Sequence, residues 1–525
     1  MRELVNAFFD ERSAAQHHIS SYNDFVDNWI QSVVDNISVG DDEVPDGIIQ
    51  TDVEGYKIKM GSIRVGRPQR KEADGSTDYL TPMEARLRDM TYDAPIFMEF
   101  IPVLEGIEHE PEEVNIGNLP IMVGSSRCNI EKDNLEELQN ASYTHEEYYQ
   151  ELQRLQEDPL DPGGYFIANG SERVLVSLED LAPNKVMVEF KKRYGRQVEV
   201  AKVFSQRNGY RALISVEKKR DGSLMVDVPN ASNQIPLIVF MRALGLQTDE
   251  ELVKAIVTHP DMMPTVLANI EDAREEHDVA DRDEAIEFLG RKLAGGQARE
   301  YRRQRAESLM DRTLLPHLGH DPAERLKKAV YLGRMARSVL ELAQGRNEED
   351  DKDHYANKRI KLAGNLMEDL FRVSFTQLAK DIKYQIERAH SRNRELKVST
   401  AVRSDVLSQR LLHALSTGNW VGGRSGVSQL LDRTAALAAY SHVRRVVSPL
   451  ARSQPHFEAR DLHPTQWGRL CPNETPEGPN CGLVKNMALT TEVSEGAEGE
   501  DIRHSLYDLG VEPLEVSEVT GGDDE

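Results

Sequence analysis

Two glutamates in a proline-rich stretch are the first side chains in this sequence that could do chemistry. Glu474 and Glu477 lie three residues apart within residues 461–489, a run with four prolines, three glycines and two cysteines. Two carboxylates can bind a metal ion or act as an acid and base pair. Proline fixes φ and favours extended backbone in the residue before it, so this run is predicted to be a shaped loop. The local pattern favours a structural or loop-capping role for the glutamates.

The same loop contains a candidate metal site made of His463, Cys471 and Cys481. Structural zinc sites usually combine two close pairs of Cys or His, each pair separated by two to four residues. The two cysteines here have nine residues between them and no second pair follows, so small buried or loop thiols are the favoured interpretation. We expect this chain to bind no metal ion or other cofactor.

Paired arginines precede the loop and could bind phosphate. Arg444 and Arg445 follow a predicted helix of apolar and small residues at 430–440, and Arg452 and Arg460 come next. Arginine can hold a phosphate through two parallel hydrogen bonds. It can also compensate the negative end of a helix dipole. The local pattern leaves both interpretations open.

A glycine-rich turn is the last local candidate, at Gly418, Gly422, Gly423 and Gly426. It matches neither the phosphate loop of nucleotide-binding proteins nor the dinucleotide fingerprint, so a flexible turn is expected, although its backbone amides could still meet a phosphate. The zinc-protease, serine-hydrolase and kinase signatures are also missing from the sequence. The residues therefore predict a scaffold with one loop-rich, basic region and no self-contained active site.

The distribution of charge points to a polyanion. The 525-residue chain has a formal net charge of −25, which alone argues against nucleic acid because phosphate attracts Lys and Arg. Residues 351–490 nevertheless contain 21 Lys and Arg against 13 Asp and Glu, a local charge of +8 that leaves −33 for the rest. Such asymmetry is typical of a polyanion-facing region. A solvated helical face explains the local excess equally well.

Length and composition predict a soluble, cytoplasmic protein of roughly three or four domains. Three cysteines do not form a secreted disulfide framework. The first residues lack the basic start and apolar core of a signal peptide. No run approaches the roughly 18 apolar residues that a membrane-spanning helix needs, so no membrane partner is expected.

Alternating helical and strand-like periodicity must position the candidate residues. Phe25, Trp29, Val33 and Ile37 predict an amphipathic helix up to about residue 40. Period-two alternation predicts strands at 47–65, 93–125, 163–178 and 183–230, with an Asn-Gly turn in the third range. Helical spacing recurs at 235–245, 249–258, 282–296, 300–312, 321–345 and after residue 359. The fold class is therefore a multidomain α+β protein.

Polar segments separate these elements. Residues 131–158 are predicted to form a loop and a helix, and residues 346–353 a polar hinge. Residues 491–525 contain 12 acidic residues and one Arg, which predicts poor order in isolation. In the helix after residue 359, two apolar rows predict a buried face: Leu362, Leu366 and Leu370 in one, and Met367, Phe371, Leu378, Ile382 and Ile386 in the other.

Several motifs resemble the second-largest subunit of multisubunit DNA-directed RNA polymerases, the bacterial β-subunit family. The later ones are GVSQLLDR at 426–433, SHVRR at 441–445 and LHPTQWGRLCPNETPEGPNCGLVKN at 462–486. The earlier ones are ISSYNDFVDNWI at 19–30, LTPMEARLRDMTYDAPIF at 80–97, IGNLPIMVGSSRC at 116–128, GGYFIANGSERVL at 163–175 and DKDHYANKRIKLAG at 351–364. The pattern is most similar to the archaeal form, and the acidic composition suggests a halophile. Because the unsplit subunit is about twice as long, the chain resembles B″, the N-terminal piece of the split subunit.

The resemblance implies a division into modules. Residues 1–178 would form the first segment of the protrusion, 179–349 the lobe, 350–405 the return segment of the protrusion, and 406–490 the fork. Residues 491–525 would begin a domain completed by the partner chain, B′, which is the C-terminal half of the subunit.

The resemblance also implies a role in template-directed RNA synthesis. The catalytic aspartates and their Mg²⁺ would lie in the largest subunit, and this chain would not be active alone. Arg444, Arg445 and Arg452 match fork residues beside template and downstream DNA, and Glu477 and Asn480 would lie near the incoming nucleoside triphosphate. The template DNA and the RNA–DNA hybrid would be partners of the assembled enzyme. Gln429, Asp432 and His442 match the fork wall, which binds rifamycin in bacterial enzymes. The fork would help to keep the downstream strands apart.

Two alternatives belong to other classes. One is a non-catalytic paralogue that binds nucleic acid or polymerase. The other is a self-sufficient, metal-dependent nucleotidyltransferase, which would need bound magnesium and activity in the isolated chain. The full set of motifs favours the polymerase subunit over both.

Overall fold

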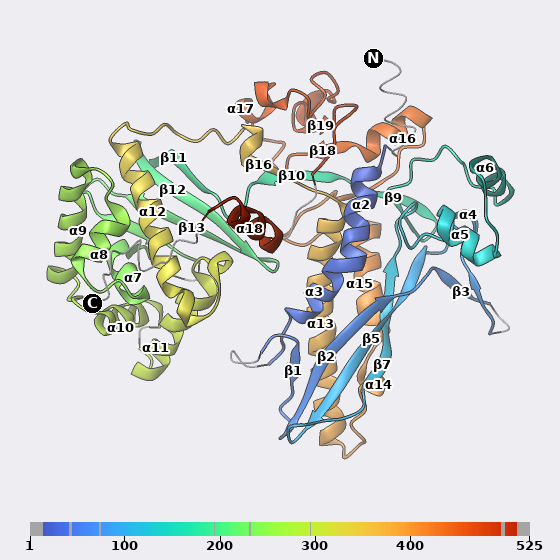
Figure 1. Ribbon diagram of the computed structural model, residues 1–525, viewed down its shortest axis with the longest axis horizontal. Coiled ribbons are helices and arrows are strands. Elements are labelled where there is room, and N and C mark those ends of the chain that lie inside the picture. The colour runs from blue at the N-terminus through green and yellow to red at the C-terminus, as the bar shows by residue number, and fades with distance from the viewer. Residues whose placement is uncertain are drawn as a thin grey trace. The chain divides into compact units, whose positions relative to one another are not determined.

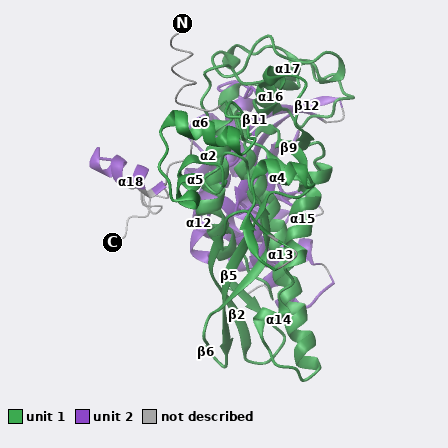
Figure 2. Ribbon diagram, turned by 90° about the vertical axis from the view of Figure 1, so that its right-hand side faces the viewer, with its two compact units in different colours: residues 1–180, 353–495 green, residues 181–352, 496–525 purple. Residues whose placement is uncertain are grey.

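Contacts within the chain divide it into two compact units, which Figures 1 and 2 show in ribbon form. This computed structural model describes residues 14–40, 45–72, 75–193, 195–229, 231, 233–294, 296–494 and 499–511. Unit 1 comprises residues 1–180 and 353–495, and unit 2 comprises residues 181–352 and 496–525. Both units mix helices and strands, which confirms the α+β class. The assignment of protrusion, lobe and fork stays a prediction.

Unit 1 contains a five-stranded sheet whose alternation was predicted. Its strands are β1 (Ile48–Gln50), β2 (Tyr56–Val65), β5 (Asp93–Leu104), β6 (Ile107–Glu108) and β7 (Glu112–Pro120). β5 pairs antiparallel with both β2 and β7. Tyr56, Ile58 and Met60 are buried while Lys57 and Lys59 are exposed, as a half-buried strand requires.

Helices cover this sheet. The N-terminal helix runs through α2 (Gln16–Asp24), the π-helical turn η1 (Phe25–Trp29) and α3 (Ile30–Asp35). The other helices that pack on the sheet come from a later part of the chain: α13 (Ala363–Ser391), α14 (Val398–Ala401) and α15 (Ser404–Thr417). α3 packs against β2 and α15 against β7. Both predicted apolar rows of α13 are buried, so that prediction is confirmed.

The start of α13 is held against α2 at a glycine. The backbone amide of Gly364 donates to Ser21 Oγ at 3.1 Å, and a Cβ at this position would overlap the Ser21 backbone. The approach of the two helices therefore depends on the absence of a side chain at residue 364.

Smaller elements complete unit 1. They are β3 (Gln69–Lys71), β4 (Thr77–Tyr79), α4 (Pro82–Leu87), α5 (Lys132–Gln139), α6 (His145–Arg154), β8 (Phe166–Ala168), β9 (Ser171–Leu175), β10 (Ser177–Leu181), η6 (Tyr355–Asn357), β16 (Lys358–Lys361), β17 (Ser428–Leu430), α16 (Ala436–Val443), β18 (Arg445–Val447), α17 (Phe457–Arg460), η7 (Pro464–Gln466), η8 (Gly478–Asn480) and β19 (Val484–Asn486). Asn169 and Gly170 both have left-handed φ in the turn between β8 and β9, which confirms the predicted hairpin.

Two local predictions need correction. Residues 131–158 contain two helices, α5 and α6, where one was expected. The helix predicted at 430–440 begins only at Ala436, because Ser428–Leu430 pairs with β9 as strand β17. Tertiary pairing thus overrides the local helical pattern in the first of these residues.

A four-stranded sheet gathers distant parts of unit 1. Its order is β16-β10-β18-β19. β10 pairs in parallel with β18, so that Ser177 lies opposite Val446, and β18 pairs antiparallel with β19, so that Arg445 lies opposite Asn486. This sheet carries the loops that contain most of the candidate site.

Unit 2 combines an antiparallel meander with helices. The strands are β11 (Val186–Arg193), β12 (Arg196–Arg207), β13 (Tyr210–Lys218), β14 (Leu224–Asp227) and β15 (Ile235–Pro236). The helices are α7 (Leu237–Leu244), α8 (Asp249–Ile256), η2 (Pro260–Met262), α9 (Met263–Glu275), α10 (Arg282–Leu293), α11 (Arg299–Ser308), η3 (Leu309–Thr313), η4 (Pro316–Leu318), η5 (Pro322–Glu324), α12 (Arg325–Ala343) and α18 (Gly499–Asp508). α12 packs against β11, β12 and β13. The predicted strands and five predicted helices are confirmed.

Two features of unit 2 differ from the sequence predictions. Helix α9 was not predicted, because the polar Asn269 interrupts the apolar spacing of Val266, Ile270 and Ala273 on its buried face. Asn269 is satisfied there, since its Oδ1 accepts from the amide of Leu224 at 2.7 Å. The acidic end, predicted to be poorly ordered, contains helix α18, while residues 512–525 lie outside the described part. Across the described residues, no helix has both the length and the apolar character needed to cross a bilayer.

Candidate functional site

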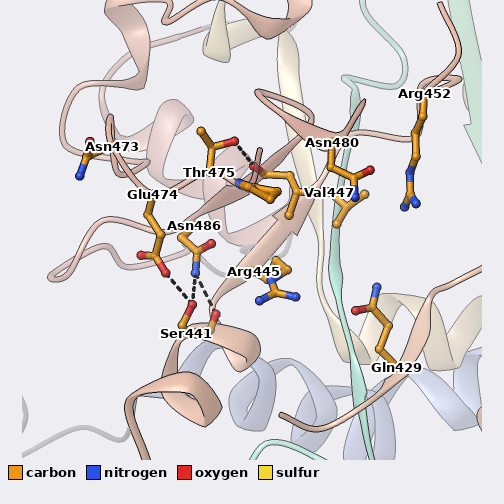
Figure 3. A pocket seen from close by; sticks show the side chains of 12 residues that line it. Gln429, Ser441, Arg445, Val447, Arg452, Asn473, Glu474, Thr475, Asn480 and Asn486 are labelled. Atoms are coloured by element: carbon orange, nitrogen blue, oxygen red, sulfur yellow. Dashed lines mark hydrogen bonds between the residues drawn. The ribbon is translucent and has the colours of Figure 1, made fainter. Parts of the chain in front are cut away.

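A cavity of about 500 Å³ lies in unit 1 between the loops around β18 and β19. It brings together four of the predicted site residues: Gln429, Arg445, Arg452 and Asn480. Figure 3 shows their side chains around the same space; Gln429 comes from β17, Arg445 from β18, Asn480 from η8, and Arg452 from the segment after β18. Glu474, which the sequence analysis had considered as a candidate, also lines the cavity. Four further polar residues were not predicted: Ser441, Asn473, Thr475 and Asn486. The lining thus combines two guanidinium groups and one carboxylate with the apolar side chains of Val447, Pro476 and Val484.

Strand pairing places Arg445 in the cavity wall. Arg445 lies opposite Asn486 in the β18–β19 pair. The Asn486 side-chain amide donates to the backbone oxygen of Ser441 at 2.8 Å and to its Oγ at 3.0 Å. Ser441 Oγ in turn donates to Glu474 Oε1 at 2.5 Å (Figure 3). This chain of bonds ties the end of α16 to the proline-rich loop, so Arg445 projects from a fixed frame.

The proline-rich loop is itself cross-linked by hydrogen bonds. Thr475 Oγ1 accepts from the amide of Gly482 and donates to the carbonyl of Val484, both at 2.9 Å. Arg460 donates to the carbonyls of Pro479 at 2.8 Å and Cys481 at 2.7 Å. Gly482 has a φ of +73° and lies against the Arg460 backbone, where a Cβ would not fit. The predicted shaped loop is confirmed, and the guanidinium of Arg460 is used to hold the loop backbone.

The adjacent arginines 444 and 445 have different environments. Arg444 is buried, and its guanidinium donates to the carbonyls of Ala14, Ala488 and Leu489 at 3.1, 2.6 and 3.0 Å. Arg445 is only partly buried, and its guanidinium makes no hydrogen bond or ion pair with any residue that the structure describes. Arg444 is therefore an internal anchor, which removes the basis for its predicted phosphate contact. Arg445 stays available for one.

The predicted fork-wall residues form a hydrogen-bonded row. The amide of Asp432 donates to His442 Nδ1 at 3.1 Å, so the ring proton lies on Nε2, which contacts Gln429 Oε1 at 3.0 Å. Gln429 also donates to the carbonyl of Gly426 at 3.0 Å. Burial and the nearby charge of Arg445 lower the pKa of His442 to about 4, so the ring is neutral at pH 7. Gln429 alone of the three lines the cavity.

The two glutamates of the loop separate. Glu474 lines the cavity and is held by Ser441. Glu477 is exposed, precedes η8 and is not among the lining residues. The structure thus brings Glu474, and not Glu477, to the cavity. The proximity of Glu477 to a nucleotide stays a prediction.

A buried charge cluster, the Glu179 network, supports the four-stranded sheet. It consists of Glu179, Tyr355, Lys358, Ser448 and Lys485. Glu179 Oε1 accepts from Lys485 at 3.0 Å, from Lys358 at 3.3 Å and from Ser448, while Tyr355 donates to Oε2 at 2.9 Å. Burial raises the pKa of Glu179, but the two lysines outweigh it and hold this pKa below its ordinary value. The network joins β10, β16 and β19.

A second cluster, the Arg433 network, holds the segment that follows Gln429. It consists of Arg86, Glu157, Asp161, Glu172 and Arg433. Arg433 donates to Glu172 Oε2 and to Asp161 Oδ2, both at 2.7 Å. Arg86 donates to Glu172 Oε1 at 2.8 Å and to Glu157 Oε2 at 2.9 Å. Together with the pairing of β17 and β9, this network fixes the wall that carries Gln429.

The lining residues suit an anion better than a metal ion. Hard cations such as Mg²⁺ take several oxygen ligands with carboxylates among them. The cavity offers one carboxylate, already bound to Ser441, and two arginines. No group of three His, Cys, Asp or Glu in the described ranges is placed to hold a metal ion, and His463, Cys471 and Cys481 do not form one.

The glycine-rich segment is a turn, as predicted. Gly418, Gly422, Gly423 and Gly426 all have φ between +70° and +78°. A phosphate contact by its amides stays untested.

Comparison with known proteins identifies the family. Residues 13–409 match the family model described as RNA polymerase beta subunit, and residues 429–493 match RNA polymerase Rpb2, domain 3. The chain is 50% identical to DNA-directed RNA polymerase subunit Rpo2N of Halobacterium salinarum, over 100% of this chain and 99% of the relative. It is also 50% identical to Rpo2N of Methanocaldococcus jannaschii, over 97% of this chain and 99% of the relative. It is 46% identical to subunit Rpo2 of Saccharolobus solfataricus, over 99% of this chain but 44% of the relative. The chain therefore belongs to the RNA polymerase beta-subunit family, as the N-terminal part of the second-largest subunit of a DNA-directed RNA polymerase.

Proposed function

We propose that the cavity around Arg445 contributes to DNA binding, to downstream strand separation and to one side of the nucleotide site of the assembled polymerase. The observation that supports this proposal is the pair of guanidinium groups, Arg445 and Arg452, that face a 500 Å³ cavity without a carboxylate partner in the described part of the chain. Guanidinium is the group best suited to hold phosphate oxygens.

The two arginines differ in how firmly they are held. Arg445 lies in β18 between β10 and β19, so its position is set by strand pairing. Arg452 is exposed on the loop that follows β18. Arg445 would hold a phosphate at a defined place, and Arg452 would add charge. Contacts of this kind position a strand without reading its sequence.

The reaction of the enzyme is nucleotidyl transfer, in which the RNA 3′-hydroxyl attacks the α-phosphate of a nucleoside triphosphate and pyrophosphate leaves. Two metal ions, which we place in the largest subunit, would stabilise the attacking and leaving oxygens. The contribution of this chain is positive charge and positioning, which dominate such chemistry. Asn480, in the cavity wall, could orient a polar group of the substrate.

The module names follow from the same family. We propose that residues 179–349, most of which lie in unit 2, form the lobe, that residues 406–490 form the fork, and that residues 1–178 and 350–405 form the protrusion. The partner subunits of a polymerase include the C-terminal half of this subunit and the largest subunit, and residues 491–525 would pair with the former. The charge of −25 supports adaptation to high salt; relatives from Halobacterium and Methanocaldococcus are equally similar, so this proposal rests on charge alone.

Substitution of Arg445 tests the proposal. Arg445→Ala in reconstituted polymerase should slow elongation and raise the KM for nucleoside triphosphates, because a phosphate contact would be lost. Loss of a charge-assisted hydrogen bond costs about 1.5–3 kcal/mol, so the effect on kcat/KM should be about 10- to 100-fold. Elongation on a nucleic-acid scaffold measures it.

Arg410→Ala is the matched control, because Arg410 is exposed on α15 and does not line the cavity. It should leave elongation unchanged. Assembly of both variants is checked by gel filtration of the complex. A properly assembled Arg445→Ala enzyme with wild-type elongation would show that this arginine does not act on nucleic acid or nucleotide.

A further inference from the structure

A second basic cavity lies at the C-terminal end of α13, in unit 1. It has a volume of about 250 Å³ and is lined by four basic side chains: Arg388, Arg392, Arg394 and Lys397. Figures 1 and 2 show α14 and the end of α13 at the end of unit 1 opposite to α17. This cavity is therefore separate from the candidate site.

Local backbone geometry brings the four cations together. Arg388 and Arg392 are one turn apart, so they lie on the same face of the helix end. Asn393 then adopts a left-handed φ of +51° and ends the helix, with the amide of Arg394 bonded to the carbonyl of Ala389 at 3.0 Å. The chain turns back, and Arg394 and Lys397 come to face the last turn of α13 across the cavity.

This cluster is not explained by ion pairing. The guanidinium groups of Arg388, Arg392 and Arg394 are exposed and have no carboxylate within 4.0 Å among the residues that the structure describes. Lys397 pairs with Glu395 at 3.0 Å, and this carboxylate is the only acidic side chain in the cavity lining. Other arginines of unit 1, such as Arg403 with Asp381, do pair with carboxylates.

Compensation of the helix dipole is also insufficient as an explanation. The C-terminal end of a helix carries roughly −0.5 elementary charge. Four cations and Glu395 leave a formal charge of +3 at this end. Like charges one helical turn apart are destabilising by a few tenths of a kcal/mol. Such a concentration of positive charge, in a chain of net charge −25, fits a bound anion.

The lining distinguishes a phosphate from a protein partner. Protein interfaces rely on aromatic and large apolar side chains at their centre. This cavity contains no aromatic residue, and Ile386 is its only large apolar one and is fully buried. Guanidinium forks match phosphate oxygens in pairs. We propose that the cavity formed by Arg388, Arg392, Arg394 and Lys397 binds the sugar-phosphate backbone of DNA, at a point on unit 1 away from the candidate site.

Salt dependence provides the test. Each phosphate contact contributes about −0.9 to the slope of log K against log salt for duplex DNA. The triple variant Arg388→Gln, Arg392→Gln, Arg394→Gln in reconstituted polymerase should therefore bind more weakly, with a slope about 2 to 3 smaller in magnitude. The probe is a linear duplex with a central bubble and long flanking arms, measured over a series of KCl concentrations. The same duplex with shortened arms should bind wild type and variant alike.

A charge-matched control uses three exposed arginines elsewhere on unit 1: Arg64, Arg154 and Arg410. Their replacement by Gln should leave the slope as in wild type. A photoreactive amino acid in place of Arg392 should cross-link to the DNA arm. An unchanged slope in the assembled triple variant, or cross-linking to a protein subunit alone, overturns the proposal. The salt slope and the cross-link do not involve Arg445. A negative result would therefore overturn this proposal without bearing on the function proposed for the cavity around Arg445.

Discussion

The Glu179 network and the Arg433 network support different elements of the candidate site, and they distribute charge in opposite ways. In the first, one carboxylate receives two ammonium groups, and Glu179 and Lys485 have side chains only 4% and 7% exposed. In the second, Arg86 and Arg433 share three carboxylates, and Arg433 is 40% exposed. Among the described residues, Lys485 has Glu179 as its only carboxylate partner, whereas Lys358 also pairs with Asp353. In the second network, each arginine has two carboxylate partners. The two networks should therefore respond differently to the loss of one carboxylate.

The largest effect is expected for Glu179→Gln. It leaves Lys485 buried without its carboxylate, while Lys358 keeps Asp353 at 3.4 Å, and breaking a buried pair costs about 3–5 kcal/mol. Amide hydrogen exchange in the assembled polymerase should show faster opening of β10, β18 and β19. Glu172→Gln is the matched control, since Arg86 keeps Glu157 and Arg433 keeps Asp161. Equal effects of the two substitutions would remove the distinction between the networks.

A smaller effect is expected for Arg433→Lys. Lysine keeps the charge but cannot donate to Glu172 and Asp161 at once in the same geometry. Because the side chain is 40% exposed, solvent screening reduces the cost to about 1 kcal/mol. Exchange in β9 and β17 should rise while β18 and β19 are unaffected. Faster exchange in β18 would mean that the two networks are coupled.

The smallest effect is expected from pH. Lysine neighbours lower the pKa of Glu179, so its stabilising contribution is present above its ordinary pKa and is lost as pH falls through the lower, folded value. In the Arg433 network, burial raises the pKa of Glu157 despite Arg86, so the Glu157 contribution has the opposite sign. The pKa of Glu172 is lowered, since its arginines outweigh burial, and it offsets Glu157.

Denaturation of wild type and single variants over a pH series measures these signs. The stability advantage of wild type over Glu179→Gln should shrink below about pH 4. As pH rises through the folded pKa of Glu157, the free energy of unfolding of wild type should fall relative to that of Glu157→Gln. A shift in the same direction for both variants would contradict the assigned pKa directions.

Local periodicity predicted many helices and strands, because the side chains that each element buries recur at the spacing of a helix or a strand. The rows of α13, the Asn169-Gly170 hairpin and the strands of unit 2 all repeat at helix or strand spacing. Helix α9 was missed since a buried Asn269 looks polar in sequence, although its hydrogen bonds satisfy it.

The candidate site was predicted less completely. Its loop, Arg445, Arg452, Gln429 and Asn480 were identified, mainly through family motifs. The neighbours Arg444 and Arg445 could not be distinguished in sequence, because their different burial depends on where β18 begins. Glu179 was not predicted either, since nothing local indicates that β10 pairs with β18.

The pairing of β10 with β18 has a consequence for synthesis of the chain. Ser177 pairs with Val446, and residues 181–352 of unit 2 lie between them in sequence. Long-range parallel pairing forms slowly, and domains of a growing chain fold as they emerge. Unit 2 can therefore fold on the ribosome while β10 still presents an open edge and Glu179 has no lysine partner. The polymerase cavity becomes complete only after Asn486 has emerged, which makes β10 in the nascent chain a site for unwanted strand pairing or for chaperone protection.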